Sequence, residues 1–175
     1  MSFEIIDNFL EKSFFDLISK DIKSSKIPWY FREVDVRPKE KNNLSITRNK
    51  NGYFSFCYFE NNTTDSPLFY KHIVPVLVKL NAISLVHIRA LLFFRDKDTI
   101  ESAFHTDFNL PNIKTAILYL NDCNGGTVVK QNEKEVFVKS VSNRVLIMDE
   151  NIEHKGVYQT DTHKRYLLNF NYFTK

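Results

Sequence analysis

The chain has 175 residues, of which 43% are hydrophobic, and it contains 16 Phe, 8 Tyr and 1 Trp. This composition excludes an intrinsically disordered chain, and the length suits one domain with a substantial buried core. The formal net charge of +3 is small and the basic residues form no dense block, so the charge does not favour nucleic acid as a partner.

The cysteines and the N-terminus bear on location. Cys57 and Cys123 are the only cysteines, and without metal-binding spacing they fit free thiols in a reducing compartment better than a disulfide framework. The N-terminus shows no basic region followed by an apolar core, so no signal peptide is expected. No apolar stretch approaches the roughly 20 residues needed to cross a bilayer. We therefore expect a soluble, cytoplasmic protein without a membrane partner; its oligomeric state is not predicted.

The first third of the chain predicts three strands and one helix. Apolar residues recur at helical spacing around Ser13, where Ser13 and Asp16 resemble a capping box, so we expect an amphipathic helix ending near Ser24. The other elements expected here are strands at 3–10, 27–36 and 53–59 and a polar loop at 37–52.

A second helix is expected after Ser66. Ser66 followed by Pro67 is typical of an N-cap with proline at the first helical position. The helix should continue to Leu80 with a kink at Pro75, because proline removes a backbone hydrogen bond. His72, beside a lysine on this helix, is expected at the surface.

From Ser84 onward, short strand-like runs alternate with turn signals, among them Gly125 and Gly126, which we expect to form only a turn. Many short strands joined by turns indicate a jelly-roll sandwich or barrel. The predicted fold class is mainly β with flanking helices (α+β): a single domain, 1–175, in which residues 1–83 support a core formed by 84–175. The strands expected in the core are 84–94, 103–108, 115–120, 127–130, 135–139, 144–148, 155–160 and 165–173.

His105 and Asp107 are the first candidate site residues. In a strand, residues two apart point to the same face, so these two side chains would project into one cavity. An unpaired buried carboxylate is costly, and a metal ion would satisfy both groups. The pair alone is a weak signal, because His-x-Asp often occurs by chance.

Two further residues strengthen this interpretation. His154 stands in a polar turn after an apolar strand, and two imidazoles with one carboxylate form the facial triad of non-haem Fe(II) oxygenases. Arg165 begins a strand eleven residues later, and its planar guanidinium can bind a carboxylate bidentately. Asn169 and Asn171 share the inward parity of Arg165, so we expect both at the pocket, which Phe93 is also expected to line.

Several short segments occur in the order and at the spacing of one known family. They are Phe104-His105-Thr106-Asp107, Tyr119-Leu120-Asn121, Gly125-Gly126-Thr127, Asn143-Arg144 with Asp149, His154-Lys155-Gly156 and Arg165-Tyr166-Leu167-Leu168-Asn169-Phe170. Through them, residues 86–173 resemble the Fe(II)/2-oxoglutarate-dependent dioxygenases, most closely the prolyl 4-hydroxylase-like branch. The sequence of this region is similar to that of small family members encoded by bacteriophages, which would place the protein in the cytoplasm of a bacterial host.

The resemblance implies a fold, a cofactor set and residue roles. It implies a double-stranded β-helix (cupin-like jelly roll) with N-terminal helices, and Fe(II) held by His105, Asp107 and His154. Arg165 and Tyr119 would bind the distal carboxylate of 2-oxoglutarate. The implied reaction consumes O2, hydroxylates a C–H bond and releases succinate and CO2.

The substrate and two other function classes stay open. A peptidyl proline is the substrate suggested by analogy. Residues 39–51 and 95–102 match no known substrate loop of the family, so a free amino acid or another small molecule stays open. The protein is alternatively a non-catalytic jelly-roll module that binds a metal or ligand, or a nucleic-acid demethylase of the same superfamily. The complete triad favours the enzyme, and the small net charge disfavours the demethylase. His87 lines the pocket or lies in the core or rim, and His163 is expected in an exposed turn.

Overall fold

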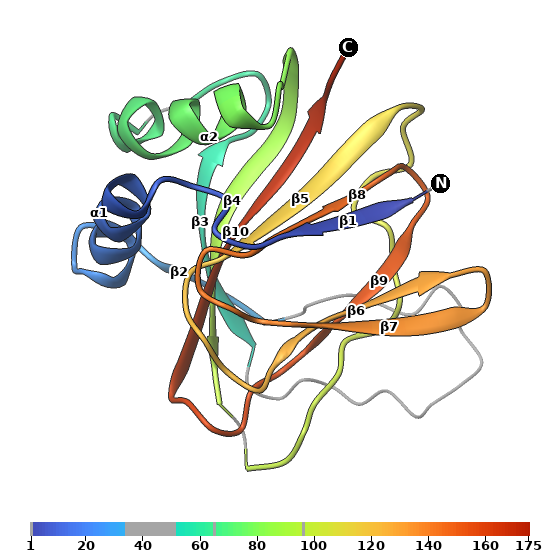
Figure 1. Cartoon of the computed structure of the whole chain (residues 1–175). Coiled ribbons are helices and arrows are strands. Elements are labelled where there is room, and N and C mark those ends of the chain that lie inside the picture. Colours follow the sequence, from blue (N-terminus) through green and yellow to red (C-terminus); the bar gives the residue numbers. More distant parts are fainter. Residues whose placement is uncertain (1, 34–51, 65, 96) are drawn as a thin grey trace.

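The computed structural model describes residues 2–33, 52–64, 66–95 and 97–175. Two antiparallel sheets face one another (Figure 1). The large sheet has the order β1 (Phe3–Ile6), β8 (Val145–Met148), β5 (Ile113–Tyr119), β10 (Lys164–Phe173), β4 (Ser84–Phe94), β3 (Tyr53–Phe59) and β2 (Tyr30–Arg32). The small sheet has the order β7 (Lys134–Lys139), β6 (Gly126–Gln131) and β9 (Glu153–Val157).

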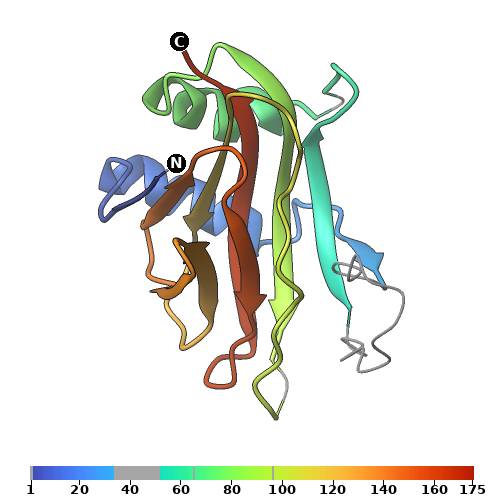
Figure 2. The same ribbon diagram turned by 90° about the vertical axis from the view of Figure 1, so that its right-hand side faces the viewer.

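The chain passes repeatedly between the two sheets from β5 onward. Strands β5, β8 and β10 belong to the large sheet, whereas β6, β7 and β9 belong to the small one. The long strands β4 and β10, green and red in Figure 2, run side by side through the middle of the large sheet. This alternation is that of a jelly-roll double-stranded β-helix, and the predicted fold class is confirmed.

The helices cover the face of the large sheet that points away from the small sheet (Figure 1). They are α1 (Lys12–Lys23) and a π-helical segment, η1 (Phe69–Ile73), that continues directly as α2 (Val74–Lys79). Buried residues of both helices, such as Ile18 and Ile73, pack with Ile88 and Ala90 of β4 in one core. Among the described residues, no helix has the length and apolar character needed to cross a membrane.

A second core fills the space between the sheets, because alternate residues of each strand point to opposite faces. Leu91 and Phe93 of β4 point into this second core, together with Val129 of β6 and Val138 of β7. The inner face of β4 therefore faces the small sheet, and this is where the candidate site lies.

Several local expectations were wrong. The first helix begins at Lys12, and its N-cap, Glu11, makes no side-chain capping bond, so the capping box at Ser13 does not form. His72 is fully buried rather than at the surface, because Tyr58 and Asp21 satisfy its two ring nitrogens.

The second helix differs from its prediction mainly at its start. Ser66 accepts a hydrogen bond from the backbone N–H of Leu68 at 3.2 Å, but regular helix begins only at Phe69, as a π-helical turn. Pro75 lies in the first turn of α2, at the point where the π-helical segment passes into the α-helix, and the N–H of the preceding Val74 donates to the carbonyl of Phe69.

The predicted strands also need adjustment. Residues 103–108 form no strand, and only His105 makes an isolated bridge. Strand β9 begins at Glu153, so His154 lies within a strand and not in a turn. Of the predicted strand at 27–36, only Tyr30–Arg32 is a strand, and residues 34–36 lie outside the described residues. Most of the predicted loop at 37–52, and the unmatched segment 39–51, lie outside them as well.

Candidate active site

Backbone pairing brings the two predicted histidines together. The segment between β4 and β5 runs antiparallel to β9, with bridges from Glu101 to Val157 and from His105 to His154. At the second bridge, His105 N–H donates to the carbonyl of His154 at 3.0 Å, and His154 N–H donates to the carbonyl of His105 at 2.9 Å. This reciprocal pair of hydrogen bonds fixes the backbones of both histidines. The site is therefore assembled by a backbone bridge and not by the strand alternation expected from the sequence.

His105, Asp107 and His154 then converge through their side chains. Oδ1 of Asp107 lies 3.5 Å from Nε2 of His105 and 3.7 Å from Nε2 of His154. The two imidazole centroids are 4.5 Å apart. One ligand atom from each residue lies within 4.8 Å of the others, so the three atoms can hold a metal ion.

Hydrogen bonds on the far side of each group set this orientation. Nδ1 of His105 lies 3.0 Å from the carbonyl oxygen of Ala103, and Nδ1 of His154 lies 3.4 Å from that of Ile152. A carbonyl oxygen only accepts, so Nδ1 donates in each ring, and Nε2 presents its lone pair to the centre.

The carboxylate of Asp107 is fixed in the same way. Its Oδ2 accepts hydrogen bonds from Nδ2 of Asn169 and Nδ2 of Asn171, each at 2.9 Å, which leaves Oδ1 facing the histidines. Nδ2 of Asn171 also donates to Oγ1 of Thr115 at 3.0 Å. Both asparagines come from β10, so the inward parity predicted for them puts their amides against Asp107.

The protonation states suit metal binding. Burial alone would raise the pKa of Asp107, but His105 and His154 in their protonated forms, together with Arg89 and Asn171, stabilise the carboxylate and hold its pKa well below the usual range. Burial lowers the pKa of His154, with Asp107 acting in the opposite direction. The site thus favours an ionised carboxylate and a neutral imidazole at neutral pH, the forms that ligate metals.

Arg165 lies in the same cavity. Its side chain is 1% exposed, and Nη1 donates to the carbonyls of Gly126 and Val157 at 2.8 Å each. The guanidinium lies over the ring of Phe93, 4.6 Å from the centroid. Gly156 lies close to the other guanidinium nitrogen, Nη2. A Cβ atom added to this glycine would lie 3.9 Å from it. A permanent positive charge is therefore held rigidly inside an apolar core.

Tyr119 lies close to this charge. Its hydroxyl donates to Oγ1 of Thr127 at 2.8 Å, and Thr127 lines the cavity. Burial raises the pKa of Tyr119 to about 12, although Thr127 and Arg165 lower it, so the phenol remains a hydrogen-bond donor.

One cavity contains most of the predicted residues. Its walls include His105, Asp107, His154, Arg165, Phe93 and Asn169. Asn171 and Tyr119 lie behind its walls. Asn171 donates a hydrogen bond to Asp107, and Tyr119 donates one to Thr127. His87 lines a different cavity, and His163 is exposed. Residues that sequence reasoning did not assign to the site also line it, namely Arg89, Leu91, Ser102, Ile117, Thr127, Gly156 and Leu167.

The sequence contained a signal for some of these missed residues and none for others. Arg89 shares the inward parity of Phe93 on β4, so strand alternation already indicated its direction. Ser102 and Gly156 could not be found in this way, because a contact across the fold brings them together: Gly156 N–H donates to Oγ of Ser102 at 2.8 Å.

No protein-family model and no curated protein matches the sequence. Solved structures do match. A prolyl-4-hydroxylase from Pseudomonas putida superposes with a TM-score of 0.61 at 11% identity, over 99% of this chain and 92% of that one. The chain has the fold of the 2-oxoglutarate/Fe(II) oxygenases.

Two further structures show the breadth of this fold. A prolyl hydroxylase from Trichoplax adhaerens, in complex with a hypoxia inducible factor peptide fragment, matches with a TM-score of 0.63 at 16% identity, over 98% of this chain and 83% of that one. HygX from Streptomyces hygroscopicus, with nickel, 2-oxoglutarate and hygromycin B bound, matches with a TM-score of 0.59 at 12% identity, over 99% and 83%.

Proposed function

We propose that the protein is an Fe(II)- and 2-oxoglutarate-dependent oxygenase that hydroxylates a C–H bond. The observation that carries the proposal is the convergence of Nε2 of His105, Nε2 of His154 and Oδ1 of Asp107 on one point of a cavity that also contains a buried arginine. Two imidazoles and a carboxylate on one side of a metal leave the opposite positions open for other ligands.

The residues present fit an iron ion at this point. Each imidazole is anchored through Nδ1 and Asp107 through Oδ2, so each ligand is held by an outer partner, as metal ligands in proteins usually are. Oδ1 of Asp107 and the Nε2 lone pairs of His105 and His154 all present electron pairs to one centre, with the two nitrogens 3.5 and 3.7 Å from the carboxylate oxygen, and a cation there would bind all three, which supports a metal.

Arg165 supports 2-oxoglutarate as the co-substrate. The side chain is fully ordered by two backbone carbonyls and by the ring of Phe93, so it can bind a carboxylate without further loss of conformational freedom. We assign the distal carboxylate of 2-oxoglutarate to Arg165, with the hydroxyl pair of Tyr119 and Thr127 beside it.

Iron, 2-oxoglutarate and O2 together would supply the oxidising power for hydroxylation, with succinate and CO2 as co-products. The chain itself would orient the reactants and keep water out. Leu91, Ile117 and Leu167 form the apolar wall of the cavity, and a dry wall strengthens the electrostatic hold of Arg165 on an anion. Asn169 and Asn171 would keep Asp107 in its ligating orientation.

The substrate class is a narrower proposal. Peptidyl proline is our first candidate, because two of the structural neighbours are prolyl hydroxylases. HygX has the same fold and binds hygromycin B, so a substrate screen should include small molecules as well as proline-containing peptides.

The test is 2-oxoglutarate-dependent formation of succinate by the iron-loaded protein. We expect Arg165→Ala to reduce succinate formation at least about a hundredfold, since a buried charge-assisted contact is worth about 3 kcal/mol. Lys164→Ala, which alters the exposed neighbouring residue, is the matched control and should retain wild-type turnover.

Arg165→Lys, compared with Arg165→Ala, guards against a folding defect because it keeps the charge in the core. Circular dichroism should show that all three variants fold. The proposal would be overturned if folded Arg165→Ala turned over 2-oxoglutarate at the wild-type rate, or if the wild-type protein formed no succinate above the metal-free background.

A further inference from the structure

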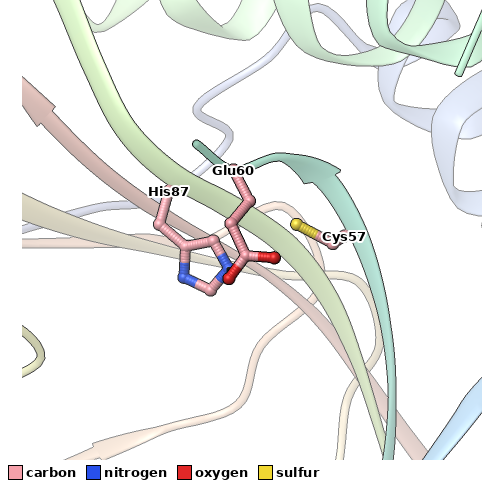
Figure 3. A group of neighbouring side chains, drawn as sticks. All are labelled: Cys57, Glu60 and His87. Carbon is pink, nitrogen blue, oxygen red and sulfur yellow. Dashed lines mark ion pairs between the residues drawn. The ribbon is translucent and has the colours of Figure 1, made fainter. Parts of the chain in front are cut away.

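A second group of metal-ligating side chains lies outside the candidate active site. Cys57, Glu60 and His87 each offer one ligand atom, and these atoms lie within 4.8 Å of one another. Figure 3 shows the thiol and the imidazole on either side of the Glu60 carboxylate. Among the described residues, this group and the His105, Asp107 and His154 group are the two clusters of this kind.

A β-bulge creates this cluster. Cys57 of β3 pairs with Arg89 of β4, but the register then shifts so that Phe59, and not Tyr58, pairs with Ile88. Residues 57 and 60 would point to opposite faces of a regular strand. The extra residue reverses the parity and turns Glu60 to the face that carries Cys57 and His87.

Neighbouring structure positions the backbone of Glu60 and the ring of His87. Glu60 begins a tight turn in which its backbone exchanges hydrogen bonds with Thr63, at 3.2 and 3.0 Å. The ring of His87 packs edge-on against Phe108, with centroids 6.1 Å apart. Nε2 of His87 lies 4.0 Å from Oε1 of Glu60, close enough for one ion to bridge them.

The cluster is accessible from solvent. Glu60 and His87 line a cavity of about 340 Å³ together with Asn61, Asn62 and Phe108. The side chain of His87 is 16% exposed and that of Glu60 is 60% exposed. An ion can therefore enter, and Glu60 has the freedom to close on it, with space left for a water ligand.

The groups around the cluster act in both directions on its protonation. Burial lowers the pKa of His87, as Arg89 and Arg32 also do, while Glu60 and Asp107 raise it; the neutral ring is the ligating form. Burial and Glu60 raise the pKa of the Cys57 thiol, against smaller opposing effects of Phe59, Arg89 and Arg32. Without a metal the thiol donates weakly to the carbonyl of Ile88, at 3.7 Å.

We propose that Cys57, Glu60 and His87 form a second metal site, selective for Zn²⁺ and chemically similar divalent ions. Thiolate, imidazole and carboxylate are the donors that Zn²⁺ uses in proteins, and three protein ligands leave a fourth position for water. On binding, the metal displaces the thiol proton to solvent and forms the metal–sulfur bond. The soft sulfur donor distinguishes this site from the all-nitrogen-and-oxygen site at His105, Asp107 and His154.

The two sites share a strand pair. His87 of β4 pairs with Asn171 of β10, and Asn171 donates to the carboxylate of Asp107. A protein saturated with a divalent transition metal should therefore bind two ions, and only one of them should have a sulfur ligand.

The test uses Co²⁺ as the probe, in the His105→Ala/His154→Ala variant of the 175-residue chain, under anaerobic conditions. We expect one equivalent of Co²⁺ to give the near-ultraviolet thiolate-to-cobalt charge-transfer band, and Zn²⁺ to displace it. Adding Cys57→Ser should abolish the band. Glu60→Gln should weaken Co²⁺ binding by at least the roughly tenfold that loss of an outer-shell partner causes.

Cys123→Ser is the matched control, since Cys123 is the other cysteine of the chain and is buried away from the cluster. It should retain the full band. The proposal is overturned if the folded double variant gives no thiolate band, or if the band survives Cys57→Ser. Both outcomes are independent of the proposed oxygenase function, because the two imidazole ligands of the proposed iron site are absent from the protein tested.

Discussion

At the scale of single residues, Asp107 is fixed through one carboxylate oxygen, which leaves the other free to ligate a metal. Oδ1 faces the two histidines, and Oδ2 accepts hydrogen bonds from Asn169 and Asn171. Partners of this kind restrict a metal ligand to its binding orientation before the metal arrives, and losing one typically weakens metal affinity by about 10- to 100-fold.

Asn171→Leu tests this restraint. The substitution keeps the side-chain volume but removes one donor to Oδ2 of Asp107, so we expect the dissociation constant for Fe(II) to rise about tenfold or more. Anaerobic calorimetry provides the measurement. Asn109→Ala, an exposed change two residues from Asp107, is the control and should bind Fe(II) like the wild type. Unchanged affinity in folded Asn171→Leu would mean that Asn171 has no part in positioning Asp107.

The sequence indicated the site residues better than it indicated their geometry. His105 and Asp107 were predicted to converge by strand alternation, whereas a backbone bridge to β9 brings His105 to His154. His72 was expected at the surface from a neighbouring lysine, but its partner Asp21 is 51 positions away in the sequence. Local patterns carry no information about such distant partners.

At the scale of elements, an ionic cluster joins α1 to η1. Asp21 is buried on α1 and accepts hydrogen bonds from Lys26 at 2.8 Å, Lys71 at 2.6 Å and Nε2 of His72 at 3.1 Å. These three donors, with Lys26 the largest influence, hold the pKa of Asp21 well below its usual range against the effect of burial. The cluster thus fixes the position of one helical segment relative to the other.

The pH dependence of stability follows from this shift. Because folding lowers the pKa of Asp21, its contribution is complete above the unfolded value of about 4 and declines as the pH falls toward the folded value. We expect Asp21→Asn to cost about 1–2 kcal/mol of unfolding free energy at pH 7, and clearly less at pH 3. Urea denaturation at the two pH values measures the difference.

Asp16→Asn is the matched control for this measurement. Asp16 lies on the same helix and pairs with Lys12, but both side chains are exposed, so the change should have little effect at either pH. An Asp21→Asn penalty that stayed constant from pH 7 to pH 3 would contradict the ionic account of the cluster.

The bulge in β3 is one of the element-scale features that sequence reasoning missed. The alternation of Phe54, Phe56 and Tyr58 predicted a regular strand, and the strand does form. The shift after Cys57 depends on how β3 pairs with β4, and that pairing is not encoded in the alternation of either strand. Cys57 has no other metal-ligating residue at a characteristic spacing in the sequence. In the fold it nevertheless lies beside His87, which is 30 positions further along the chain.

At the scale of the whole molecule, the two-sheet jelly roll explains why one cavity can hold both a metal triad and a buried arginine. The small sheet contributes His154, the large sheet contributes Arg165, and the segment between β4 and β5 contributes His105 and Asp107. Helices on the outer face stabilise the large sheet without reaching the cavity.

The architecture was predictable from the sequence because strand periodicity and turn residues recur so regularly after Ser84. The order of strands within the sheets was not, because β1 and β4 find partners far along the chain, β8 for β1 and β10 for β4. The wall residues of the cavity depend on that order, which is why Ser102, Thr127 and Gly156 emerged only with the fold.

An anaerobic titration of Fe(II) into the metal-free protein, with and without 2-oxoglutarate, tests the central claim most directly. We predict a weak visible charge-transfer band of a metal-chelated 2-oxo acid in the wild type, only when both Fe(II) and 2-oxoglutarate are present. The band should vanish in His105→Ala and persist in Cys57→Ser, which leaves the triad intact. Fe(II) binding to the wild type without any such band would contradict the account and leave the protein a metal-binding scaffold.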